Sequence, residues 1–93
     1  MIVARRTFKA VRGRARELAK FLVENDTPSE NYRVYIAHSG EAENVVIDNE
    51  FESLAEYEQK WTAFFAKISK DGSLAKVMEL TTGSHLEFFE IVK

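Results

Sequence analysis

Residues 51–72 read FESLAEYEQKWTAFFAKISKDG, and the apolar side chains in this stretch recur at the spacing of an α-helix. Ser53 followed by Glu56 forms a capping box, and Gly72 can adopt the left-handed conformation that ends many helices. One wide apolar stripe runs along this helix and comprises Leu54, Tyr57, Trp61, Phe64, Phe65 and Ile68. Because such a stripe needs a large apolar surface, we expect it to be buried over a β-sheet.

The rest of the chain supplies the strands of that sheet and two further helices. In chain order we expect a strand at 2–10, a helix at 13–25, strands at 32–38 and 44–51, the helix just described, a short helix at 73–79 and a strand at 85–92. Pro28 ends the first helix, and the residues Ser39-Gly40-Glu41-Ala42 should turn the second strand back into the third. No repeat or linker interrupts this order, so residues 1–93 should form a single domain.

This order of elements is the split β-α-β pattern of ferredoxin-like α+β domains. It predicts a four-stranded antiparallel sheet with strand order 4-1-3-2 and both main helices on one face. Side-chain alternation assigns to the helix-facing side Ile2, Ala4, Val34, Ile36, Val45, Ile47, Leu86 and Phe88. The same alternation assigns to the opposite side Val3, Arg5, Thr7, Arg33, Tyr35, Ala37, Val46, Asp48, His85, Glu87, Phe89 and Ile91.

The face opposite the helices is too apolar for a purely solvated surface and too charged for a plain core. Exposed apolar residues grouped on one surface usually mark an interface. Burying this face against a second copy would join two sheets into a barrel, and symmetric pairs are the commonest oligomers. We therefore expect a homodimer with the architecture of a dimeric α+β barrel.

Composition limits the classes of partner and compartment. Of the 93 residues, 45% are hydrophobic and 12% aromatic, which is enough for a small core. The formal net charge of -2 provides no basic field, so we expect neither nucleic acid nor a membrane surface as a partner. The absence of cysteine excludes disulfides and thiolate metal sites, and fits a reducing compartment. Because no apolar run resembles a signal peptide or membrane span, we expect a soluble cytoplasmic protein.

The segment NVVIDNEFESLAEYEQKWTAFFAKI, residues 44–68, resembles the NIPSNAP-like proteins and their antibiotic-biosynthesis-monooxygenase relatives. The likeness lies in a strand that runs almost directly into a long helix with a tryptophan near its middle. It implies membership of the dimeric α+β barrel superfamily. The monooxygenase relatives use an Asn, Trp and His constellation whose Asn lies on the first strand. Trp61 and His85 have matching residue types, whereas residues 2–10 contain no Asn.

Few side chains here belong to a recognisable catalytic motif. Trp61 lies on the apolar stripe, which favours a packing role over contact with a substrate. His38 is expected at the end of the second strand, where no second metal ligand occurs at a recognisable spacing. A glycine-rich phosphate loop, a serine nucleophile elbow and a paired-histidine helix motif are all missing from the sequence, and we expect no metal and no cofactor.

The candidate ligand site comprises Arg33, Tyr35, Asp48 and His85, which share the face opposite the helices. Asp48 can approach Arg5 or Arg33, while Tyr35 adds a ring and a hydroxyl group. Ion pairing among these residues would by itself explain the charges, and a hydrogen-bonded structural role would explain His85. As a ligand site, the cluster would suit an anionic or hydroxylated small molecule.

Three functional hypotheses follow. The first is a dimeric protein that binds a small organic molecule in a cavity between the sheet and the helices. The second, taken from the resemblance, is an enzyme of the cofactor-independent monooxygenase type. The third is a structural or interaction module without a ligand, in which case no cavity of ligand size should exist.

Overall fold

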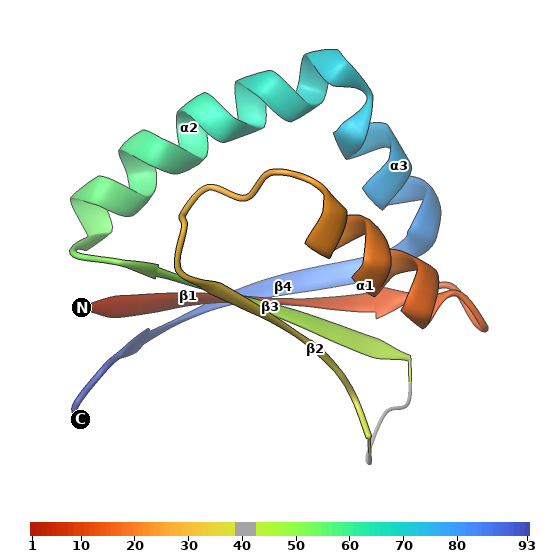
Figure 1. Ribbon diagram of the computed structural model, residues 1–93, viewed down its shortest axis with the longest axis horizontal. Helices are drawn as coiled ribbons and strands as arrows, with labels where there is room; N and C mark the ends of the chain where they lie inside the picture. The colour runs from red at the N-terminus through yellow and green to blue at the C-terminus, as the bar shows by residue number, and fades with distance from the viewer. Residues whose placement is uncertain (39–42) are drawn as a thin grey trace.

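The computed structural model describes residues 1–38 and 43–93 as one layer of strands beneath one layer of helices (Figure 1). In chain order the elements are β1 (Ile2–Ala10), α1 (Ala15–Glu24), β2 (Tyr32–Ile36), β3 (Asn44–Phe51), α2 (Leu54–Asp71), α3 (Ser73–Leu80) and β4 (Thr81–Glu90). The turn expected at 39–42 lies outside the described residues.

The strands form one antiparallel sheet in the order β2-β3-β1-β4, which is the predicted order read from its other end. Figure 1 shows all the helices above the same face of this sheet. The predicted ferredoxin-like α+β architecture is therefore confirmed. None of the helices in the described part of the chain is long and apolar enough to span a membrane.

The predicted division of the sheet into two faces is also confirmed. Ala4, Phe8, Val45 and Ile47 alternate with residues of the opposite face along β1 and β3 and are buried on the helix side. On the opposite side, Asp48 of β3 lies in register with both Arg5 and Arg33. A slip of one residue would exchange these sets, so the burial of the apolar set specifies the register.

The fourth strand is longer than expected at its start and shorter at its end. It begins at Thr81, directly after α3, and ends at Glu90 instead of Val92. The residues Thr81 to Ser84 have the composition of a loop, yet they pair with β1 as far as Ala10, with a bulge between Lys9 and Ala10. The long β1 offers backbone partners along its whole length, and this pairing outweighs the local turn preference.

The ends of α2 follow the sequence signals. The Ser53 hydroxyl accepts a hydrogen bond from the backbone N–H of Glu56 at 3.1 Å. Gly72 adopts a φ of +87°, in the left-handed region that favours glycine. Local chemistry thus specifies where this helix begins and where it ends.

The prediction that the whole apolar stripe of α2 is buried is wrong. Of its six residues only Tyr57 is buried, while Leu54 and Phe65 are 54% and 43% exposed. Figure 1 shows α2 rising away from the sheet between its start and α3, so its middle and end do not rest on the strands. The stripe instead faces a hollow between the two layers, which Trp61, Phe64, Phe65 and Ile68 help to line.

Candidate functional site

A cavity of about 380 Å³ lies between the sheet and the helices, and we call it the inter-layer pocket. Its floor is made by β1, β3 and β4, with Phe8 and Ile47 among the floor residues. All three helices supply walls, including Phe64 and Ile68 from α2 and Val77 from α3. The volume and the apolar walls are within the range of small-molecule sites, which run from about 300 to 1,000 Å³.

Arg6 contributes a positive charge to the floor of this pocket. It lies on β1 between Ile47 and Leu86, on the helix-facing side of the sheet, and is partly buried. Its guanidinium carbon lies 4.5 Å from the centroid of the Trp61 ring, and Nη2 donates to the Tyr57 hydroxyl at 3.5 Å. Among the described residues, no ion pair includes Arg6. The charge is held by aromatic groups instead of a carboxylate.

Trp61 belongs both to the packing of α2 and to the pocket wall. Its ring stacks on Tyr57 with centroids 6.2 Å apart and planes inclined by 7°. Tyr57 in turn makes edge contacts with Phe51 of β3 and Phe88 of β4, at centroid distances of 5.3 and 4.9 Å. The aromatic chain anchors the first half of α2 to the sheet. The expected packing role of Trp61 is consistent with these contacts, and its ring also lines the pocket.

The other charged residues that line the pocket are exposed, and two interactions engage three of them. Lys67 of α2 forms an ion pair with Asp26, which follows α1, and this hydrogen bond raises the pKa of Lys67. The carboxylate of Asp71 accepts a hydrogen bond from the backbone N–H of Ser73 at 2.9 Å, which lowers the pKa of Asp71. Glu24, at the end of α1, is also exposed.

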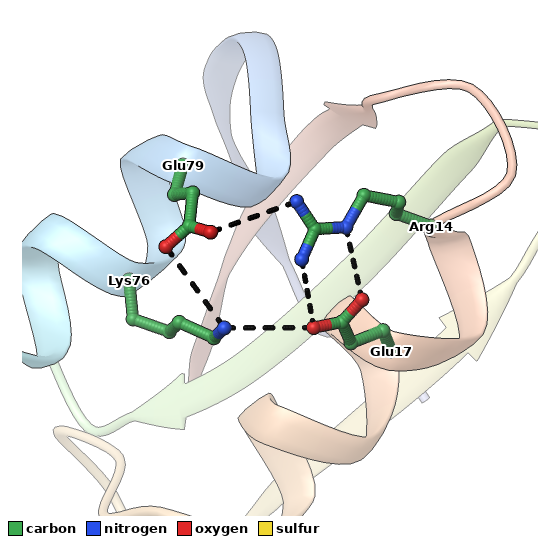
Figure 2. A network of polar contacts seen from close by, with 4 residues as sticks. All are labelled: Arg14, Glu17, Lys76 and Glu79. Carbon is green, nitrogen blue, oxygen red and sulfur yellow. Dashed lines mark hydrogen bonds and ion pairs between the residues drawn. The ribbon is translucent and has the colours of Figure 1, made fainter.

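A network of four charged side chains connects α1 with α3, two of the walls of the pocket (Figure 2). Arg14 pairs with Glu17 at 2.9 Å and with Glu79 at 3.7 Å, while Lys76 reaches Glu17 at 3.5 Å and Glu79 at 3.9 Å. The hydrogen bond from Arg14 lowers the pKa of Glu17. These groups are largely solvated, and they orient the two helices more than they stabilise the fold.

The four residues predicted as a ligand site lie on the sheet face away from the helices, and none of them lines the inter-layer pocket. The register places Arg33 directly opposite Asp48. Asp48 is only 9% exposed, and Arg5 binds its carboxylate with both Nε and Nη2, at 2.8 and 2.9 Å. This hydrogen bonding raises the pKa of Arg5.

Tyr35 and His85 occupy the two outer strands of the same face. One row across the sheet contains Tyr35, Val46, Thr7 and His85 in that order, so β3 and β1 lie between Tyr35 and His85. At the usual spacing of neighbouring strands this amounts to roughly 14 Å. His85 lies 3.2 Å from Glu87 of its own strand. The structure therefore brings Arg33 and Asp48 together but does not bring Tyr35 close to His85.

Arg6 is the pocket residue that the sequence analysis did not single out. A signal for it was present, because Arg6 continues the helix-facing alternation of Ile2 and Ala4 and precedes Phe8 in the same series. A charged residue within an apolar face is unusual and often functional. Among the described residues, no group of His, Asp and Glu is placed to hold a metal ion.

Neither a model of a known protein family nor a characterised protein sequence matches this chain. Several solved structures share its fold. A NIPSNAP-like domain protein from Burkholderia xenovorans has a TM-score of 0.84 and 16% identity, with 98% of this chain and 84% of that chain covered.

Two further structures broaden the comparison. A putative antibiotic biosynthesis monooxygenase from Chloroflexus aurantiacus has a TM-score of 0.72 and 14% identity, covering 100% of this chain and 95% of that one. A variant of MhuD with two manganese protoporphyrin IX molecules bound per active site has a TM-score of 0.77 and 19% identity, covering 100% and 96%. The chain thus has the fold of NIPSNAP-domain and antibiotic-biosynthesis-monooxygenase-like proteins, which confirms the predicted resemblance at the level of fold.

Proposed function

We propose that this protein binds a small organic molecule in the inter-layer pocket. The observation that supports the proposal most directly is the cavity of about 380 Å³, with aromatic and aliphatic walls around the positively charged Arg6. Binding sites for small molecules typically combine such walls with a few polar groups that orient the ligand. A structural module with a filled core would not need to hold α2 away from the sheet.

The structural relative MhuD binds manganese protoporphyrin IX, so a metalloporphyrin is a ligand to consider. The residues of this chain do not fit a metalloporphyrin held through histidine. His38 is exposed beyond the end of β2, and His85 lies on the face away from the pocket. The proposed ligand is therefore an organic molecule held by apolar contacts and by Arg6, without a bond from histidine to a metal.

An oxygenase-type activity is the alternative function. The expected relatives use an Asn, Trp and His constellation, and Trp61 of this chain does line the pocket. His85 lies on the other side of the sheet, and β1 contains no asparagine. Because these groups are not brought together, we propose binding as the function and leave catalysis outside the proposal.

The fluorescence of Trp61 provides a direct test, because it is the single tryptophan of the chain and lines the pocket. We expect titration with decanoate, and more weakly with 1-decanol, to change its emission in a saturable manner. Leu74→Phe, which adds volume to the pocket wall, should weaken the binding of decanoate by about tenfold or more. Ala75→Phe adds the same side chain at an exposed neighbouring position outside the lining and should leave binding unchanged.

The cluster of Arg33, Tyr35, Asp48 and His85 stays a prediction as the second candidate site. Arg33 is exposed and takes part in no ion pair among the described residues, so it remains available to an anionic ligand. In the same titration, Arg33→Ala and His85→Ala should leave the affinity for decanoate unchanged if the inter-layer pocket is the site. Loss of binding in both, with Leu74→Phe unaffected, would instead assign the ligand to the face away from the helices.

We further propose that a second copy of the chain covers the sheet face away from the helices. Tyr35 and Phe89 on this face are each 42% exposed, and Ile91 extends the apolar surface beyond β4. Sedimentation at micromolar concentration should show a dimer. Phe89→Arg should produce monomers, because it would place one further charge from each copy on the apolar surface that the interface buries.

The matched control for the dimer is Val23→Arg, which changes an exposed apolar residue of α1 on the other side of the molecule. This variant should remain dimeric. A wild-type protein that sediments as a monomer would contradict the proposed dimer without bearing on the pocket.

A further inference from the structure

The guanidinium of Arg6 is a partly buried charge without an acidic partner in the described chain. The pocket has three carboxylates in its lining, and two of them are engaged elsewhere: Asp26 by Lys67 and Asp71 by the backbone of Ser73. The third, Glu24, is exposed and forms no described ion pair with Arg6. On the strands beside Arg6, the register places Ile47 and Leu86, both apolar. A positive charge in such surroundings is stabilised by an anion that enters from solvent.

The contacts of Arg6 leave most of its N–H donors available to a ligand. The guanidinium carbon lies over the Trp61 ring, 4.5 Å from its centroid, and the Tyr57 hydroxyl accepts one N–H at the long distance of 3.5 Å. An arginine side chain has five N–H donors along the edge of its planar guanidinium, and the described hydrogen bond engages one of them. A carboxylate binds such an edge through two parallel hydrogen bonds.

The remainder of the pocket sets the character of the rest of the ligand. Phe8 and Ile47 of the floor, Phe64 and Ile68 of α2 and Val77 of α3 offer apolar contact. Since Glu24, Asp26 and Asp71 all contribute to the lining, a second negative charge on the ligand would meet acidic groups. The pocket therefore matches one anionic group joined to an apolar body.

We infer that the ligand of the inter-layer pocket is an amphiphilic monocarboxylate, whose carboxylate binds Arg6 and whose apolar part lies against the helices. This inference rests on the proposed function and names the class of ligand for the same site. It assigns to Arg6 the role of anchoring residue. It also gives Trp61 the role of holding the guanidinium in a fixed orientation by cation–π contact.

A matched pair of probes, decanoate and 1-decanol, separates the charge from the apolar body. Wild-type protein should bind decanoate at least tenfold more tightly than 1-decanol, because hydrogen bonds to charged groups are worth more than neutral ones. Arg6→Met should abolish this preference by weakening decanoate at least tenfold while retaining 1-decanol. Arg6→Lys, which keeps the charge but loses the planar donor pair, should give an intermediate preference.

Arg16→Met is the matched control, since it removes one positive charge from an exposed position of α1 outside the pocket lining. It should leave both affinities unchanged, which would show that the effect of Arg6 is local and not a result of net charge. Thermal unfolding of each variant, monitored by circular dichroism, establishes that it is folded. If Arg6→Met does not fold, the wild-type affinities for decanoate and 1-decanol still test the inference. A preference for decanoate of at least tenfold supports it, and equal binding overturns it.

The possible failures differ in their meaning. Equal binding of the two probes by the wild-type protein, or unchanged decanoate binding by Arg6→Met, would overturn the carboxylate inference while the pocket remains a binding site. If neither probe binds the wild-type protein, the proposed function itself is wrong, and the inference is overturned with it.

Discussion

Replacing Phe51 by alanine is expected to lower the free energy of unfolding by about 3 to 5 kcal/mol, the usual cost of removing a large buried aromatic side chain. Phe51 ends β3 and is 1% exposed. Its ring makes an edge contact with that of Tyr57, the one buried residue of the α2 stripe, at an interplanar angle of 86°. The substitution would therefore remove the main contact between the sheet and the start of α2. Urea denaturation at neutral pH measures the change.

Phe65→Ala is the matched control, because the same side chain is 43% exposed on α2. We expect a loss below about 1 kcal/mol there, since partial exposure leaves little transfer free energy to lose. Both variants need to be compared at one protein concentration, because a dimer couples stability to association. Comparable losses at the two positions would mean that α2 packs along its whole length and that the inter-layer pocket is closed in solution.

Substitution of Asp48 by asparagine is expected to reduce the free energy of unfolding by about 1 to 3 kcal/mol. Asp48 is nearly buried and accepts two hydrogen bonds from Arg5, so the neutral amide would leave one guanidinium N–H without its charged acceptor. The side chain of Arg5 is 40% exposed, and solvent can replace part of the lost interaction. The expected loss therefore lies below the roughly 3 to 5 kcal/mol measured when a fully buried pair is broken. Urea denaturation again provides the measurement.

Asp26→Asn serves as the comparison, because Asp26 pairs with Lys67 in full contact with solvent. Its loss should be clearly smaller than that of Asp48→Asn, since exposed ion pairs contribute little to stability. A larger effect at Asp26 would indicate that the connection between α2 and the segment after α1 stabilises the domain more than the Arg5–Asp48 pair does. Dimer formation over the sheet face would increase the effect at Asp48, because it would bury Arg5 further.

The features that the sequence alone determined are those with a local physical cause. Alternation along β1 and β3 placed Ala4, Val45 and Ile47 on the helix side, because neighbouring residues of a strand point to opposite faces. The helical period of residues 54–68, with caps at Ser53 and Gly72, predicted α2 together with its ends. Such patterns depend on residues within a few positions of one another, so they can be read before any tertiary contact is known.

The features that only the tertiary structure decided are distances between elements. The stripe of α2 has the composition of a buried face, yet Phe65 is exposed and Trp61 lines a cavity, because α2 contacts the sheet in its first half and then rises away from it (Figure 1). Arg6 and Trp61 are far apart in the sequence, and their contact at 4.5 Å depends on how high α2 lies over β1. The distance between α2 and β1 depends on the volumes of all the side chains packed between the layers and on the path of the loops. No single stretch of sequence encodes that distance.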